Sequence, residues 1–387
     1  MDVGALRAQI PALANSIYLN TGTFGPLPRV VTEEIIQGHE LISAHGAFSP
    51  VVRQRIEREG YERTRTRVAQ LVDASPDEIA LTSSASQGIC TIAYGLDWKP
   101  GDEVVITDQE HSSGELPWFV LHKRFGVNVR VVQITQSADQ ILQRFADAIT
   151  PRTRLVFASH VCSTTGQRLP AKEICALARE RNALVALDGA HAVGQFPIDL
   201  HDLQPDFYVM CGHKWLLGPQ GTAMLFVARA HLDSLQPSWI GWGAQCEYTE
   251  NLATLSYEPL ATARRFEFGT KPWTLFLGLD RAIQFIEQIG FDAIEPRVHQ
   301  LASQFKNEIA QISGLELITP QNNEHSSGLV SVVAKNFTGS DLRAFFWNHQ
   351  KILVSSHELA RRVRFSVACF NTENEIASAL DALRALA

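Results

Sequence analysis

A carboxylate and a lysine near the middle of the chain have a spacing that suits chemistry on a bound organic group. Asp188 ends the apolar run 183–187, and Lys214 follows a second apolar run at 206–210. Both runs have the length and composition of buried strands, so each side chain is expected just beyond a strand. A lysine amine placed there can condense with a carbonyl to form a Schiff base and can later carry protons.

Neither residue is diagnostic by itself. Most lysines are solvated surface groups, and an aspartate at a strand end is commonly a turn or helix-cap residue. The context of Lys214 favours chemistry, because Gly212 and Gly218 bracket it and an apolar strand precedes it. The combination of the two residues therefore carries more weight than either one.

Alternating strands and helices must position this pair. Short apolar runs predict strands at 79–82, 103–107, 130–134, 154–160 and 183–188, and amphipathic segments between them predict helices such as 138–149 and 171–182. This alternation indicates a mostly parallel sheet covered on both faces. Ligands of such sheets bind outside the carboxyl ends of the strands, where the polar residues of this chain fall.

The pattern is different at the two ends of the chain. Residues 30–72 are expected to form two helices whose alternating arginines and glutamates make a solvated face. A loop-rich stretch covers 231–271, and a helix at about 272–289 leads into a smaller unit with strands at 328–333 and 363–367. We expect an N-terminal segment at 1–25, a large domain at 26–262 and a small domain at 263–387.

Composition excludes several classes of protein. The chain has 387 residues, enough for two packed units, and its 45% apolar and 19% charged residues are typical of a globular protein. A net charge of -7 leaves no broad basic field, so nucleic acid is not an expected partner. No apolar stretch is long enough to cross a bilayer. The six cysteines are dispersed and form no Cys-x-x-Cys pair, which predicts no metal site and reduced thiols in a cytoplasmic protein.

The segment Asp188-Gly-Ala-His-Ala-Val193, followed by Cys211-Gly-His-Lys-Trp215, resembles the cofactor site of the class V aminotransferase and cysteine desulfurase family. These are pyridoxal phosphate enzymes of fold type I, and the resemblance covers essentially the whole chain. It implies an α/β fold with a mostly parallel, seven-stranded-type sheet in a large domain and a smaller α+β C-terminal domain. It also implies that pyridoxal 5'-phosphate is bound to Lys214 as an internal aldimine, with the Asp188 carboxylate paired to the ring nitrogen.

The resemblance assigns the other cofactor contacts. His111 matches the histidine that stacks on the pyridine ring, and the loop 84–88 matches the phosphate cradle at a helix start. His191, with either Ser163 or Thr164, occupies the positions that face the ring oxygen. The expected phosphate contacts are Ala85, Ser86, Cys211 and His213.

Three of these positions depart from the usual family pattern. Relatives usually carry Gln at the position of His191, Asn at that of Ser163 or Thr164, and Ser or Thr at that of Cys211. A thiol is a weaker phosphate donor than a hydroxyl.

The resemblance also implies a partner and a substrate. Thr270 matches the segment by which one subunit completes the phosphate site of the other, which implies a homodimer with two shared active sites. Arg364 matches the arginine that binds the α-carboxylate of an amino acid substrate. Some relatives place a second arginine where this chain has Ser355. Asn20, Thr21 and Thr23 lie in a loop rich in glycine and proline, which either simply connects elements or forms a substrate-facing edge.

Local likeness separates the subfamilies. Persulfide-forming desulfurases place a cysteine just before the arginine at 364, and residues 355–362 contain none. The segments 95–103, 107–111, 165–170 and 239–242 look most similar to cysteine/cystine C–S lyases, whereas the loop 20–26 resembles isopenicillin N epimerase-like members.

The leading hypothesis is therefore a C–S lyase acting on a sulfur-containing amino acid. An epimerase, aminotransferase or desulfurase on the same site, or a catalytically silent binding protein, remain the alternatives. Neither a Walker loop, a Gly-x-Gly-x-x-Gly fingerprint nor a Gly-x-Ser-x-Gly elbow is present, which disfavours nucleotide-binding enzymes and serine hydrolases.

Overall fold

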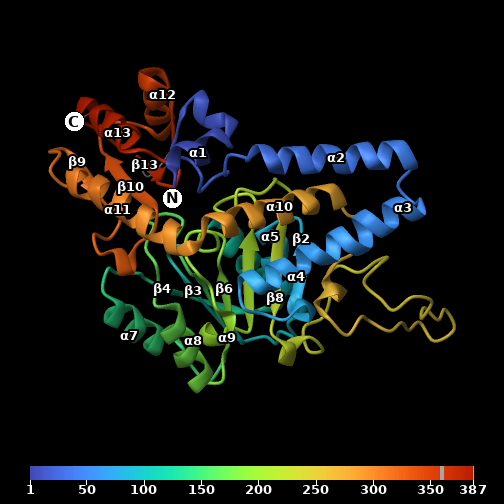
Figure 1. Cartoon of the computed structure of the whole chain (residues 1–387). Coiled ribbons are helices and arrows are strands. Elements are labelled where there is room, and N and C mark those ends of the chain that lie inside the picture. Colours follow the sequence, from blue (N-terminus) through green and yellow to red (C-terminus); the bar gives the residue numbers. More distant parts are fainter. Residues whose placement is uncertain (358–360, 387) are drawn as a thin grey trace.

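A seven-stranded sheet forms the centre of the protein in a computed structural model that describes residues 1–357 and 361–386 (Figure 1). The strand order is β2-β8-β7-β6-β5-β3-β4, and only β8 runs antiparallel to its neighbours. The mostly parallel sheet predicted from the sequence is thus confirmed. Its strands are β2 (Ile79–Thr82), β3 (Glu103–Thr107), β4 (Asn128–Val132), β5 (Thr153–Ser159), β6 (Leu184–Asp188), β7 (Phe207–Cys211) and β8 (Ala223–Val227).

Helices cover both faces of this sheet because its strands are apolar on both sides. Val105 packs into the core on one face, and its neighbours Val104 and Ile106 pack into the core on the other. The first face is covered by α4 (Glu62–Leu71), α7 (Ala138–Ala148), α8 (Ala171–Glu180) and α10 (Trp273–Ile289), and the second by α5 (Ala85–Gly95) and α6 (Leu116–Phe125). Because all the strands except β8 are parallel, their carboxyl ends lie at the same edge of the sheet.

Two sequence-based expectations need correction. Strand β4 begins at Asn128 and ends at Val132, two residues earlier than the expected 130–134. The second helix of the 30–72 region continues from α3 (Pro50–Val52) through a π-helical stretch at Arg53–Tyr61 into α4, whereas the first is α2 (Arg29–His45). Its charged side chains are not all solvated: Arg65 is 2% exposed and forms a buried ion pair with Glu267. Arg65 is buried because it pairs with Glu267, which is far away in the sequence, so the local sequence pattern could not predict this burial.

The C-terminal part contains a four-stranded antiparallel sheet of order β12-β13-β10-β9. Its strands are β9 (Leu315–Leu317), β10 (Leu329–Ala334), β12 (Ser355–His357) and β13 (Arg362–Ser366), and its helices are α11 (Phe291–Ile309), α12 (Gly339–Gln350) and α13 (Glu373–Leu386). Apolar residues of these helices and of β10 and β13 form a separate core.

The N-terminal segment joins this C-terminal part. After α1 (Val3–Ala8), strand β1 (Ile17–Tyr18) pairs in parallel with β11 (Ile352–Leu353), and both chain ends lie in the same region of Figure 1. The division into 1–25, 26–262 and 263–387 remains a proposal, and Ala387 lies outside the described residues. Among the helices of the described residues, none has the length and apolarity needed to span a membrane.

Candidate active site at the carboxyl ends of the strands

A cavity of about 780 Å³ opens at the carboxyl ends of the central strands. It is lined by loops that follow β2, β3, β5, β6 and β7, by the N-terminal loop at 22–24, and by β12 and β13 of the C-terminal sheet. The structure thus brings a cluster of polar side chains to the position that sheet topology predicts for a ligand.

Lys214 and His191 are in contact within this cavity. Lys214 Nζ lies 3.1 Å from His191 Nε2, and Trp215 Nε1 donates to His191 Nδ1 at 3.4 Å. Burial, followed by the charge of Lys214, holds the pKa of His191 well below its ordinary value, so its imidazole is neutral.

Asp188 ends β6 and lines the same cavity, where its Oδ1 accepts from the Ala190 N–H at 2.9 Å. Behind it lies Glu110, which accepts hydrogen bonds from the hydroxyls of Ser159 and Thr107 at 2.6 Å each and from the Ser159 N–H at 3.0 Å. Burial raises the pKa of Glu110 to about 7, against these hydrogen bonds and with a small additional rise from the Asp188 charge. Two carboxyl groups with different environments therefore stand at this end of the cavity.

The start of α5 forms one end of the cavity. The helix begins at Ala85, capped by Ser84, whose Oγ accepts from the Gln87 N–H at 3.1 Å. Ser86 Oγ lies 2.7 Å from Ser113 Oγ, which in turn lies 3.1 Å from His111 Nδ1. A helix N-terminus with hydroxyl and imidazole groups beside it suits an anion.

His213, Cys211 and His111 complete this end. His213 Nδ1 is buried without a hydrogen-bond partner in the described part of the chain, and burial, with the Lys214 charge, lowers its pKa to about 4. Burial raises the pKa of the Cys211 thiol, which keeps it protonated. The pKa of His111 is lowered first by burial and then by Lys214.

Arg364 also lines the cavity. Its guanidinium donates to the Ser163 carbonyl at 2.7 Å and to the Thr23 hydroxyl at 3.1 Å, and its buried Nε finds no acceptor among the described residues. Burial, with the nearby charge of Arg362, lowers its pKa to about 10, so it remains cationic. Thr164 lines the cavity beside Ser163 and donates its hydroxyl to Gln109.

Three residues singled out from the sequence do not line this cavity. Asn20 forms a bridge to Ser366, and the side-chain oxygens of Asn20 and Thr21 are buried without partners in the described residues. Thr270 is exposed and likewise absent from the cavity wall of the single chain. Thr23, the third polar residue expected at a substrate-facing edge of this loop, does line the cavity.

Sequence reasoning gave no role to Glu110 or Arg362, both of which line the cavity. Glu110 was visible only as the neighbour of His111, and its burial depends on Ser159 of another strand. Arg362 did carry a local signal, because residues two apart on a strand share a face and Arg364 was already a candidate.

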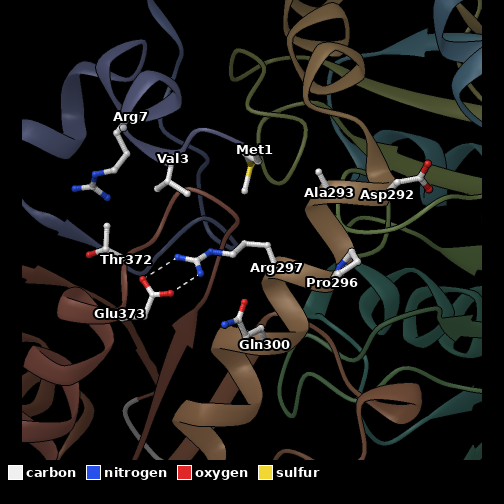
Figure 2. A pocket seen from close by; sticks show the side chains of 11 residues that line it. Met1, Val3, Arg7, Asp292, Ala293, Pro296, Arg297, Gln300, Thr372 and Glu373 are labelled. Atoms are coloured by element: carbon white, nitrogen blue, oxygen red, sulfur yellow. Dashed lines mark hydrogen bonds and ion pairs between the residues drawn. The ribbon is translucent and has the colours of Figure 1, made fainter.

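A second cavity, of about 740 Å³, lies between α1, α11 and the start of α13 (Figure 2). Both of its arginines are paired with carboxylates: Arg297 donates to the Glu373 carboxylate, and Arg7 is ion-paired with Glu375 at 2.8 Å. The Arg297 hydrogen bond lowers the pKa of Glu373 to about 2. These pairs join the N-terminal helix to the C-terminal part.

Comparison with known proteins supplies the context for the first cavity. The sequence model described as aminotransferase class V matches residues 17–378. A probable cysteine desulfurase of Methanothermobacter thermautotrophicus is 30% identical to this chain, over 96% of this chain and 94% of its own. An isopenicillin N epimerase of Streptomyces clavuligerus is 31% identical, over the same shares of the two chains.

The chain is also similar to C-DES, described as a cystine C–S lyase. Its complex with the reaction product cysteine persulfide superposes with a TM-score of 0.89 at 28% identity, covering 97% of this chain and 99% of that chain. A C-DES mutant with glycine covalently linked to the pyridoxal phosphate cofactor has the same TM-score and identity, with 98% of both chains covered.

Proposed function

The chain belongs to the class V aminotransferase family and is a pyridoxal phosphate-dependent enzyme, and on that premise we propose that it is a lyase that removes sulfur from an amino acid of the cysteine or cystine type. Its relatives show that it is similar to cysteine desulfurases and C–S lyases. The choice of elimination rests on the composition of the cavity wall.

The residues present fit the cofactor. A phosphorylated pyridine aldehyde needs a cation or N–H donors for its phosphate, a carboxylate for its ring nitrogen and an amine for its carbonyl. The cavity offers a helix start at Ala85, the imidazole of His213, the strand-end carboxylate of Asp188 and the amine of Lys214. Each chemical requirement therefore has a side chain in the same cavity.

In this proposal Ala85, Ser86, Cys211 and His213 hold the phosphate, and Asp188 pairs with the ring nitrogen. His111 covers the ring. The ring oxygen is faced by His191 and by Ser163 or Thr164. When bound, the cofactor supplies an electron sink that stabilises negative charge at the substrate Cα.

The chain's own groups then bind substrate and move the proton. Arg364 binds the α-carboxylate, because its guanidinium stays charged and is already oriented by Ser163 and Thr23. Lys214 Nζ takes the Cα proton, and His191, 3.1 Å away, keeps the amine in place. The Cβ–S bond breaks with its electron pair going to sulfur, and water converts the remaining three-carbon unit to pyruvate and ammonia.

The absence of a reactive thiol near Arg364 favours direct elimination. Ser355, Ser356 and His357 of β12, the strand paired with the one that carries Arg364, line the cavity beside it. No cysteine occurs in the sequence from 355 to 362, of which 358–360 lie outside the described residues. Cys211 is the one cysteine among the cavity-lining residues described, and burial raises its pKa. A thiol without thiolate character is a poor sulfur acceptor. Sulfur is therefore expected to leave on the substrate fragment.

The test is product analysis with purified enzyme. Incubation with L-cystine should release pyruvate, ammonia and cysteine persulfide in equal amounts, and L-cysteine should release sulfide in place of the persulfide. Racemised substrate or a keto acid that keeps its sulfur, without pyruvate, would rule out the lyase.

Epimerisation is the second candidate, favoured by the 31% identity to an isopenicillin N epimerase. It begins with the same removal of the Cα proton but returns a proton to the opposite face and breaks no C–S bond. Chiral chromatography of recovered amino acid, run beside the pyruvate assay, separates the two reactions.

Replacing Lys214 tests whether the protein is a catalyst or a silent binding protein. Lys214→Ala should abolish the near-visible absorption of lysine-bound cofactor and reduce kcat by at least about a thousandfold, since both the amine and the base are lost. Lys172→Ala, which removes an exposed lysine paired with Asp202, is the matched control and should keep both properties. Wild-type protein without that absorption band, even after incubation with the cofactor, would favour the silent alternative.

A further inference from the structure

Arg362 is a cavity-lining arginine for which the described part of the chain supplies no anionic partner. Its side chain is half-buried and lines the wall of the active-site cavity. In the stretches 1–357 and 361–386, no carboxylate or carbonyl oxygen accepts a hydrogen bond or ion pair from its guanidinium. Burial lowers its pKa, as expected for a cation that has lost water without gaining an anion.

Other buried or half-buried arginines of the protein do have partners. Arg65 is paired with Glu267, and Arg297 with Glu373. Arg364, in the same cavity wall, is oriented by Ser163 and Thr23. A partly desolvated guanidinium without an acceptor costs free energy, which an anionic ligand would recover.

The register of the small sheet fixes where this charge stands. On β13, Arg362 and Arg364 are two residues apart and therefore share a face, about 7 Å apart along the strand. His357 on β12 is opposite Arg362, and Ser355 is opposite Arg364. This wall of the cavity therefore carries two guanidinium groups along one strand, with the polar side chains of Ser355 and His357 on the neighbouring strand.

We infer that Arg362 binds a second anionic group on the substrate, a carboxylate at the far end of its side chain, while Arg364 binds the α-carboxylate. The inference rests on the proposed function, which makes the α-carboxylate the ligand of Arg364. It names the substrate class: sulfur amino acids whose sulfur-bound substituent ends in a carboxylate.

Charge balance in the cavity supports this assignment. Arg362 itself lowers the pKa of Arg364, so the two guanidiniums repel each other. A ligand with a single carboxylate at Arg364 leaves Arg362 uncompensated, whereas a ligand with two carboxylates removes the repulsion and supplies the missing acceptor. Cysteine is too short to do so; a disulfide or thioether with an extended acid is long enough.

Matched mixed disulfides of L-cysteine test the inference, because the bond that breaks is the same in each. The mercaptopropionate disulfide ends in a carboxylate, and the mercaptopropionamide disulfide is its neutral counterpart of nearly equal size. Wild-type enzyme should prefer the acid over the amide by at least about tenfold in kcat/KM of pyruvate release, mainly through KM. Equal values for acid and amide would overturn the proposal.

Two variants locate the preference at this residue. Arg362→Gln should reduce the acid-to-amide ratio of kcat/KM to within about threefold. Arg362→Glu should prefer the mixed disulfide of cysteine with cysteamine, which ends in a cation, over the acid. Arg361→Gln is the control: its side chain is exposed and donates to the Lys335 carbonyl, so its removal should leave the ratio unchanged. A ratio that survives in Arg362→Gln would contradict the assignment.

Calorimetry separates failure of this inference from failure of the proposed function. L-aminosuberate, the all-carbon analogue of the acidic disulfide, contains no sulfur to release, and its side-chain amide is the neutral control. Wild-type holoenzyme should bind the acid at least about tenfold more tightly than the amide, and Arg362→Gln should not. This difference is expected even if no disulfide yields pyruvate, in which case only the lyase would be ruled out.

Discussion

Individual side chains in the cavity owe their properties to partners from other elements. Lys214 lies against the neutral imidazole of His191, which is itself oriented by Trp215. Arg364 is held by the Ser163 carbonyl and the Thr23 hydroxyl. These contacts prepare amine and guanidinium for their proposed tasks before any ligand binds.

Glu110 should give the cofactor-free protein a pH-dependent stability. Its pKa is about 7 when folded and near the ordinary 4.5 when unfolded. Between these values the folded state binds more protons, so the free energy of unfolding falls as pH rises, and the penalty is complete above pH 7 at on the order of 3 kcal/mol. In urea unfolding at pH 5 and pH 8, the free energy of unfolding of the Glu110→Gln variant should not show this decrease with rising pH.

The control for that measurement is Glu40→Gln, which changes an exposed residue of α2. Its urea midpoints should follow those of wild type at both pH values. A Glu110→Gln protein with the wild-type dependence on pH would show that Glu110 is not the titrating group.

At the level of elements, the N-terminal loop is packed directly on the lysine segment. The Gly25 N–H donates to the His213 carbonyl at 2.7 Å, and a Cβ at Gly25 would lie 2.1 Å from the Lys214 carbonyl oxygen. Only a residue without a side chain permits this approach. The loop thereby helps to set the position of Lys214.

Gly25→Ala should therefore displace the Lys214 backbone. We expect stability to fall by about 1–3 kcal/mol and cofactor affinity to fall at least about tenfold, measured by thermal unfolding and by absorbance titration with pyridoxal phosphate. Gly4→Ala, in α1 with its nearest contact at 3.4 Å, should affect neither. Wild-type cofactor affinity in Gly25→Ala would show that the loop does not position Lys214.

The buried ion pair between Arg65 and Glu267 connects the edge strand of the central sheet to the segment before Thr270. Glu267 accepts from Arg65, from the Tyr61 hydroxyl at 3.0 Å and from the Leu81 N–H of edge strand β2 at 2.7 Å. The strand continues into the loop that precedes α5. One carboxylate thus links α4, β2 and the 267–270 segment.

Removing that carboxylate should be costly. Glu267→Leu leaves Arg65 buried without its ion-pair partner at that position and should lower the free energy of unfolding by about 3–5 kcal/mol in urea titrations. The double variant Arg65→Leu/Glu267→Leu should recover part of this loss. Arg264→Gln breaks only a partly exposed contact with Glu62 and should cost less than about 1 kcal/mol. A loss below 1 kcal/mol in Glu267→Leu would contradict the account.

At the scale of the whole molecule, the long loop after β8 projects from the body of the protein (Figure 1) and exposes apolar side chains. Tyr248, Leu252 and Leu255 are 95%, 89% and 88% exposed. Exposed apolar groups gathered on one segment mark an interaction surface. The homodimer proposed from the sequence would cover them, and Thr270 would then face the cavity of the partner rather than its own.

Sedimentation velocity should accordingly give a dimer for wild type and a monomer for the double variant Leu252→Asp/Leu255→Asp. The monomer should bind pyridoxal phosphate more weakly, because Thr270 no longer reaches a phosphate site. Val131→Asp, at an exposed position of β4, should remain dimeric. A wild-type protein that stays monomeric at all concentrations would refute the shared site.

The cofactor pair and the overall fold were predictable because their signals are local. Asp188 and Lys214 each follow an apolar strand, and the two-residue period of strands and the longer period of helices place both at one edge of a parallel sheet. His111, Ser86 and Arg364 were expected at the same site because the resemblance to the family assigned them there, not because of their positions in the sequence alone. The cavity brings these residues together.

Tertiary structure alone decided which charges are paired. Arg65 looked like an ordinary charged residue in the sequence, yet Glu267, about 200 residues away along the chain, pairs with it. The spacing of Arg362 from Arg364 showed only that the two share a strand face, and not that no acceptor within the described residues faces Arg362. Likewise the burial of Glu110 depends on Ser159 of another strand. The sequence by itself therefore determined the element order and the cofactor, because these follow from local periodicity and from a motif that resembles the family, and it nominated Lys214 as the amine. Partner choice and pKa depend on distances through space, and only the folded chain sets those.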